Sequence, residues 1–226
     1  MVPHRRRPVP VDGTVLDRLE AVWSAARAAG ALGSSSLETL RAHACGYLLE
    51  QWPRLGAGRF IDCGTGSGVL GVLLSLELPD SRWTLVDASE RRCDLARQAV
   101  AAAGLGDRVS VEHAVLEDLA RTPIYREGCD GVVARSFGPA TELAECALPL
   151  LRPEAALVVS VSADTSEMWR SMPLRDRTGC EVAGEWSTPY GRFLSVRRVG
   201  PVPERLPRRR ASRRRSPLSM TVSRET

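Results

Sequence analysis

The spacing of apolar residues changes twice along this chain. Near the amino end, residues 13–30 and 34–52 place apolar side chains three and four positions apart, as in Leu16, Leu19 and Trp23. This is the spacing of an amphipathic helix, and the serines that open the second segment add a helix-capping signal. The pattern therefore predicts two helices ahead of the first strand.

From residue 58 the pattern becomes an alternation of short apolar runs with segments of helical spacing. The runs expected as strands are 58–63, 82–88, 108–114, 129–135 and 154–162, and the expected helices are 69–78, 90–104, 116–120 and 140–151. Such alternation builds a parallel, doubly wound sheet with helices on both faces. Residues 179–199 break the alternation, because they contain two strands around a Thr-Pro-Tyr-Gly turn and no helix.

These elements predict an α/β protein with a mostly parallel, seven-stranded sheet that ends in an antiparallel hairpin. This is the outline of the class I methyltransferase (Rossmann-like) fold. We expect three parts: an N-terminal helical extension (1–55), the Rossmann-like domain (56–200) and an Arg/Pro-rich tail (201–226). The tail has little apolar content, and the expectation is that it is extended or disordered.

Composition adds limits to this picture. The 226 residues are 43% hydrophobic and 26% charged, enough for one good core, with a formal net charge of +4. Six cysteines stand singly without C-x-x-C spacing, which predicts reduced thiols and no metal site. We expect neither a signal peptide nor a membrane span, because no apolar run follows the arginines near the start and no run approaches 18 apolar residues. We expect a cytoplasmic protein, monomeric and without membrane contact.

The stretch DCGTGSG, residues 62–68, is the main candidate for ligand binding. It follows a strand at the edge where open α/β sheets bind ligands, and its glycines let the backbone turn sharply beside a nucleoside. Asp87 ends the next strand and should accept hydrogen bonds from ribose hydroxyls. Gly66 to Gly71 also satisfies the G-x-G-x-x-G pattern of dinucleotide folds, so an NAD-binding or nucleotide-binding module is one alternative. Asp62 favours a cationic ligand, S-adenosylmethionine, over a pyrophosphate.

Four segments of the sequence together resemble bacterial 16S ribosomal RNA methyltransferases of the GidB type. They are FIDCGTGSGVLG, HAVLEDLA, VVARSFGPA and LPRRRASRRRSPL. The resemblance covers roughly residues 40 to 218. It implies S-adenosylmethionine as cofactor and N7 of a guanine in the 530 loop of 16S rRNA as target. The cofactor contacts that it implies are Gly64, Val69, Leu116, Glu117 and Arg135, to which the loop and second-strand arguments add Gly66 and Asp87. His43 falls where that family has a histidine, and Glu117 or the cofactor carboxylate could pair with Arg135.

Three segments depart from the family pattern. Residues 30–35 replace a longer part with an Asn-Leu-Thr segment, Val69-Leu70 replaces Phe-Pro, and residues 159–164 lack a Lys-Gly pair. The shortened part motivates a second alternative, a small-molecule S-adenosylmethionine-dependent methyltransferase. Catalytic residues stay unassigned, because the fourth strand carries neither a [DN]-P-P-[YFW] motif nor a nucleophile, and Cys129 is expected in the core. Guanine N7 offers its lone pair in the ring plane, so alignment suffices without a general base.

The tail supplies candidates for RNA contact. Six arginines gather there and could bind phosphates with an affinity that falls with salt. They are Arg208, Arg209, Arg210, Arg213, Arg214 and Arg215.

Overall fold

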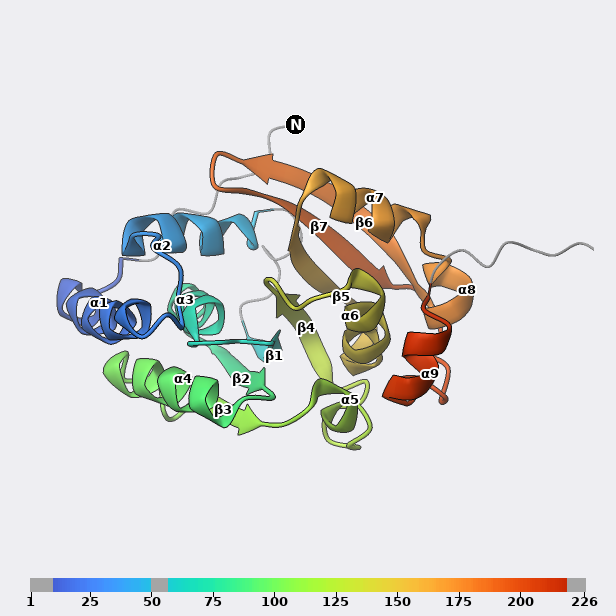
Figure 1. The fold of residues 1–226 in the computed structure, drawn as a ribbon, viewed down its shortest axis with the longest axis horizontal. Coiled ribbons are helices and arrows are strands. Elements are labelled where there is room, and N and C mark those ends of the chain that lie inside the picture. Colours follow the sequence, from blue (N-terminus) through green and yellow to red (C-terminus); the bar gives the residue numbers. More distant parts are fainter. Residues whose placement is uncertain (1–9, 50–56, 219–226) are drawn as a thin grey trace, which may run out of the picture.

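A computed structural model describes residues 10–49 and 57–218 (Figure 1). Its seven-stranded sheet has the order β3-β2-β1-β4-β5-β7-β6. The strands are β1 (Gly58–Cys63), β2 (Ser81–Asp87), β3 (Val109–His113), β4 (Cys129–Ala134), β5 (Leu151–Val161), β6 (Cys180–Thr188) and β7 (Gly191–Arg198). Strands β1 to β5 run parallel, whereas β7 inserts antiparallel between β5 and β6. The predicted class I methyltransferase fold is confirmed.

Helices cover both faces of the sheet. They are α1 (Gly13–Ala28), α2 (Leu37–Gly46), α3 (Val69–Glu77), α4 (Glu90–Ala102), α5 (Leu116–Leu119), α6 (Ala140–Ala147), α7 (Ala163–Ser171), α8 (Leu174–Thr178) and α9 (Arg210–Arg215), with a 3₁₀ turn η1 (Leu148–Leu150). The first two begin at side-chain caps, since Asp12 accepts from the Thr14 N–H and Ser36 from the Thr39 N–H. Both predicted N-terminal helices are confirmed.

Alternation along each strand divides the apolar side chains between two cores. Phe60 and Val133 pack on the face covered by α1 to α4, which we call the first core. Ile61 and Val132 pack on the face covered by α5 to α8, which we call the second core. Because successive strand residues point to opposite faces, neighbours in sequence serve different cores. Cys129 is buried in the second core, as expected.

The C-terminal segment, residues 201–218, corrects the prediction of an extended or disordered tail. Val202, Leu206 and Leu218 are buried, and Leu218 belongs to the second core. Figure 1 shows α9 on the side of the sheet that carries α5 and α6. Three separate apolar anchors are enough to dock a polar segment, because each buries its side chain in a site formed by other elements. Residues 219–226 lie outside the described residues.

Within the two described ranges, no helix combines the length and the apolar character needed to cross a bilayer.

Candidate active site

The glycine loop joins β1 to α3. Gly64, Gly66 and Gly68 have φ of 68°, 60° and 78°, the left-handed region that favours glycine. A Cβ on Gly68 would lie 3.0 Å from the Cα of Ala96, so the loop packs directly on α4. A Cβ on Gly66 would meet no atom within 4 Å. The loop is therefore a tight turn with open space beside Gly66.

Asp62 stabilises the conformation of this loop through hydrogen bonds. Its buried Oδ2 accepts hydrogen bonds from Thr65 Oγ1 at 2.7 Å and from the Gly71 N–H at 2.9 Å. Burial raises the pKa of Asp62 to about 6, although both hydrogen bonds favour the ionised form. Asp62 is thus a carboxylate at neutral pH, and its charge faces the loop.

Asp87 connects the loop to the end of β2. Its Oδ2 accepts from the Gly66 N–H at 3.0 Å, its Oδ1 accepts from the Ser89 N–H at 2.9 Å, and Arg92 Nε lies 3.3 Å from Oδ1. The Asp87 residue is 4% exposed. These contacts fix the carboxylate at the loop and leave part of its acceptor capacity unused.

Two cavities flank the loop at the carboxyl ends of the strands. One, of about 400 Å³, opens between β2, β3 and β4, and the predicted cofactor residues that line it are Gly64, Asp87, Leu116 and Glu117. We call it the adenosine-side cavity, after the adenine contacts that the resemblance implies for Leu116 and Glu117. The other, of about 340 Å³, is lined by Asp62, Gly64, Gly66 and Arg135 and by Leu32, Gly33 and Ser35 between α1 and α2. We call it the loop-side cavity; the shortened segment 30–35 therefore helps to form it.

The structure thus brings six of the seven predicted cofactor residues to two adjoining cavities. Val69 is the seventh: its side chain is buried in the first core at the start of α3, and it lines neither cavity. The suggested pairing of Glu117 with Arg135 is not observed, because the Glu117 carboxylate binds Arg121 and Arg213. Arg135 lines the loop-side cavity, where a ligand carboxylate would be its natural partner.

A third cavity, of about 400 Å³, lies at the carboxyl ends of β4 and β5 and shares Ser136 and Phe137 with the adenosine-side cavity. We call it the acceptor cavity. His43 lines it, and its Nδ1 donates to the Tyr190 carbonyl at 2.9 Å. Its Nε2 is buried without a hydrogen-bond partner among the described residues. Burial lowers the pKa of His43, so Nε2 of the neutral ring is an acceptor.

Sequence reasoning missed most of the acceptor cavity. Ser160, Thr165 and Arg192 line it, from β5, α7 and β7. None of these residues belongs to a recognisable motif, since the cavity forms only where three elements from distant parts of the chain meet. His43 and the three residues Ser136, Phe137 and Gly138 of the VVARSFGPA segment did carry a signal, which came from resemblance alone.

The six tail arginines fall into two groups. Arg208 and Arg213 turn inward: Arg208 Nε donates to Glu145 at 2.8 Å, and Arg213 Nη1 lies 2.5 Å from Glu117. The other four are exposed at or near α9: Arg209, Arg210, Arg214 and Arg215. The tail is therefore part internal anchor and part basic surface.

A glycine turn between β1 and α3, a carboxylate at the end of β2 and an antiparallel β7 together define a class I methyltransferase, the class that uses S-adenosylmethionine. Solved structures agree with the fold: an O-methyltransferase from Bacillus cereus in complex with SAH has a TM-score of 0.57 at 19% identity, covering 84% of this chain and 92% of its own.

The family model for rRNA small subunit methyltransferase G (GidB) matches residues 35–170. This chain belongs to that family. Ribosomal RNA small subunit methyltransferase G of Caldanaerobacter subterraneus subsp. tengcongensis is 27% identical over 72% of this chain and 70% of its own. The protein of the same name from Leuconostoc mesenteroides is 29% identical over 76% and 74%. Membership of a methyltransferase family decides against the dinucleotide-binding alternative.

Proposed function

We propose that this protein methylates N7 of a guanine in 16S rRNA, with S-adenosylmethionine as methyl donor. The observation that carries the proposal is the pair of cavities on either side of the glycine loop, in a chain that belongs to the rRNA small subunit methyltransferase G family. The residues of these cavities match the chemistry of each part of the donor.

The donor carries a ribose diol, a sulfonium and an amino-acid end. Asp87 suits the diol, because its carboxylate is fixed at the loop and keeps free lone pairs. Asp62 places a negative charge at the loop-side cavity, which suits a cationic sulfonium. Arg135 in the same cavity suits the carboxylate of the methionine end. When bound, S-adenosylmethionine supplies an electrophilic methyl group.

The acceptor cavity suits a flat, polar base. His43 Nε2 is a buried acceptor, and purine N–H groups are donors that it could hold. A guanine N7 needs no deprotonation, so the protein's part is to orient the base and exclude water from it. The residues directly after β4 that line this cavity are Ser136, Phe137 and Gly138, which include neither a carboxylate nor an imidazole, in keeping with such a reaction.

Contact with a long RNA would use the exposed basic surface of the C-terminal segment. Arg210 lines the adenosine-side cavity itself, Arg209 directly precedes α9, and Arg214 and Arg215 lie on that helix. Arginines at this place could bind phosphates that flank the target base. We further propose that the protein works in the cytoplasm as a monomer.

The cofactor half of the proposal is tested by Gly66→Val with Gly104→Val as the matched control. Both glycines have positive φ, 60° and 68°, and both have open space around the missing Cβ. Gly66 lines the loop-side cavity, whereas Gly104 lines none of the three cavities described above. Gly66→Val should abolish S-adenosylhomocysteine binding in isothermal titration, whereas Gly104→Val should retain it at a similar cost in stability. Equal affinity of the two variants would contradict the assignment, as would NAD binding by the unmodified protein.

The target half needs RNA from a strain that lacks the gene. Incubation with the protein and S-adenosylmethionine should create N7-methylguanine in 16S rRNA, detected as primer-extension stops after borohydride and aniline treatment. Free 16S rRNA and assembled small subunits should be assayed in parallel. Cofactor binding without methylation of either substrate would favour the small-molecule alternative.

A further inference from the structure

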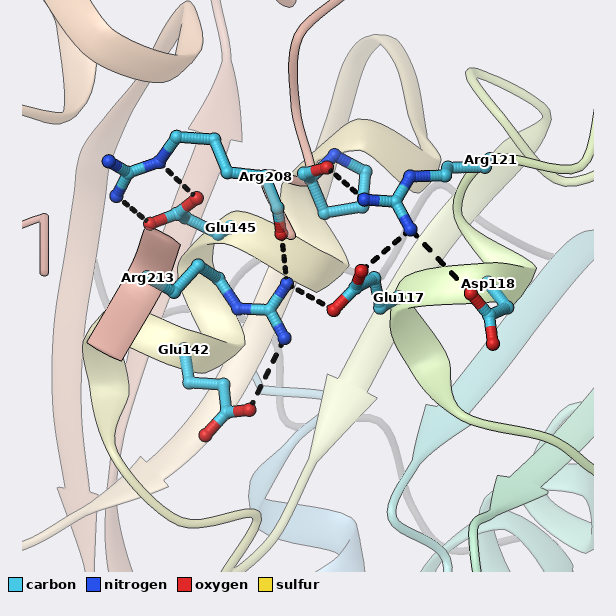
Figure 2. A network of polar contacts seen from close by, with 8 residues as sticks. Glu117, Asp118, Arg121, Glu142, Glu145, Arg208 and Arg213 are labelled. Atoms are coloured by element: carbon cyan, nitrogen blue, oxygen red, sulfur yellow. Dashed lines mark hydrogen bonds and ion pairs between the residues drawn. The ribbon is translucent and has the colours of Figure 1, made fainter. Parts of the chain in front are cut away.

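The C-terminal segment reaches the wall of the adenosine-side cavity through Arg213. This arginine is 6% exposed, and its Nη1 lies 2.5 Å from Oε2 of Glu117 in the first turn of α5. Both residues line the cavity. Figure 2 shows the two side chains pointing toward each other from α9 and α5. A residue that the sequence assigns to RNA contact therefore lies at the cofactor site.

Glu117 is held from two sides. Arg121 Nη1 lies 2.6 Å from Oε1, while Arg213 binds Oε2. The Arg121 side chain is 39% exposed and the Arg213 side chain 6%, so solvent screens the first pair far more. Burial raises the pKa of Glu117, but the hydrogen bonds from Arg121 and Arg213 outweigh this and hold the pKa below its ordinary value. Glu117 is therefore an ionised, acceptor-only group with lone pairs to spare.

Arg213 is itself fixed by the packing of the segment. Its Nη1 also donates to the Arg208 carbonyl, and its Nη2 lies 3.4 Å from Glu142. Arg208 in turn binds both carboxylate oxygens of Glu145, which is completely buried (Figure 2). Arg213 cannot turn outward to a phosphate without breaking these contacts. Its place and its partners point to a role inside the protein.

We propose that Arg213 is a positioning residue of the cofactor site, which fixes the Glu117 carboxylate to accept a hydrogen bond from the 6-amino group of the cofactor's adenine. This inference rests on the proposed function, since it takes S-adenosylmethionine as the ligand. An acceptor-only carboxylate favours a base with a 6-amino donor over a base that has only a hydrogen atom at C6 and no donor at that edge. Without Arg213, Glu117 keeps only its solvent-screened partner and loses a defined orientation.

The test is Arg213→Gln, with Arg205→Gln as the control. Arg205 lies exposed in the same segment, and its substitution removes the same charge. Two ligands are titrated into each protein by calorimetry: S-adenosylhomocysteine and its purine riboside analogue, in which a hydrogen atom replaces the 6-amino group. Arg213→Gln should weaken S-adenosylhomocysteine about tenfold and the purine riboside analogue less than about twofold, because only the first has a donor for the Glu117 acceptor. Arg205→Gln should change neither affinity.

A merely structural role would weaken both ligands equally, and that result would overturn the inference, as would an unchanged preference for the 6-amino ligand. Arg213→Lys retains the charge but has one binding point where Arg has two, so it should recover part of the preference. It also replaces Arg213→Gln if that variant fails to fold by circular dichroism. If the unmodified protein binds neither ligand, the proposed function fails; if it binds S-adenosylhomocysteine and only the effect of Arg213 is absent, the inference alone fails.

Discussion

Removal of the Arg208 side chain should destabilise the whole protein. Arg208 binds Glu145 through two nitrogens, and the Glu145 side chain is 1% exposed whereas that of Arg208 is 25% exposed. Arg208→Ala leaves a buried carboxylate without its partner, a change that costs about 3–5 kcal/mol in a fully buried pair. Because water can reach part of the Arg208 site, we expect a loss of about 2–4 kcal/mol. In a chain of this size this lowers Tm by about 5–15 °C.

The assay is urea unfolding followed by circular dichroism, with thermal unfolding as a second measurement. Arg205→Ala is the control, since Arg205 is exposed in the same segment and its loss should stay within about 0.5 kcal/mol. The double variant Arg208→Met with Glu145→Leu should recover much of the loss, because it removes both charges together. If Arg208→Ala is as stable as Arg205→Ala, the segment is not docked and the simpler picture of a free tail is correct.

Three further predictions concern the cofactor and the RNA. Asp87→Asn should weaken S-adenosylhomocysteine by about 1–3 kcal/mol in calorimetry through loss of a charged acceptor, and an unchanged Kd would place the ribose elsewhere. Burial raises the pKa of Asp62 from 3.8 to about 6, so the protonated side chain stabilises the fold fully below about pH 4, and this stabilisation is lost as pH rises through 6. The free energy of unfolding, measured relative to Asp62→Asn, should therefore fall by about 3 kcal/mol over that range. A difference that does not change with pH would refute the burial argument. Replacement of the four exposed arginines by serine should reduce the slope of log RNA affinity against log salt by about 1–3 units. The four are Arg209, Arg210, Arg214 and Arg215. An unchanged slope would show that this surface does not bind RNA.

Sequence patterns predict the sheet and the glycine loop because both depend on local signals. A period of two or of three to four marks each strand or helix, and alternating glycines mark the loop before α3. The same patterns predict no element in residues 163–178, where α7 and α8 lie. The start of α7 did carry a signal, since Ser162 accepts a hydrogen bond from the Thr165 N–H. A short amphipathic helix between a strand and a hairpin is easily missed when only the alternation is followed.

The packing of the C-terminal segment could not be predicted in the same way. Val202, Leu206 and Leu218 are too far apart to form a period, and each fills a site made by other elements. The partners of Arg213 are Glu117 and Glu142, which lie on two helices far away in the sequence. A run of arginines looks the same in sequence whether its charges meet carboxylates or solvent, and only the fold distinguishes them.

The docked segment also has a genetic consequence. A premature stop codon shortly after the codon for Arg198 leaves all seven strands in the product and removes the segment that carries Arg208 and Arg213. Such a product would keep the strands of the sheet and yet lack one wall of the adenosine-side cavity. Nonsense and frameshift alleles near the end of the coding region should therefore behave as loss-of-function alleles, as severe as substitutions in the glycine loop.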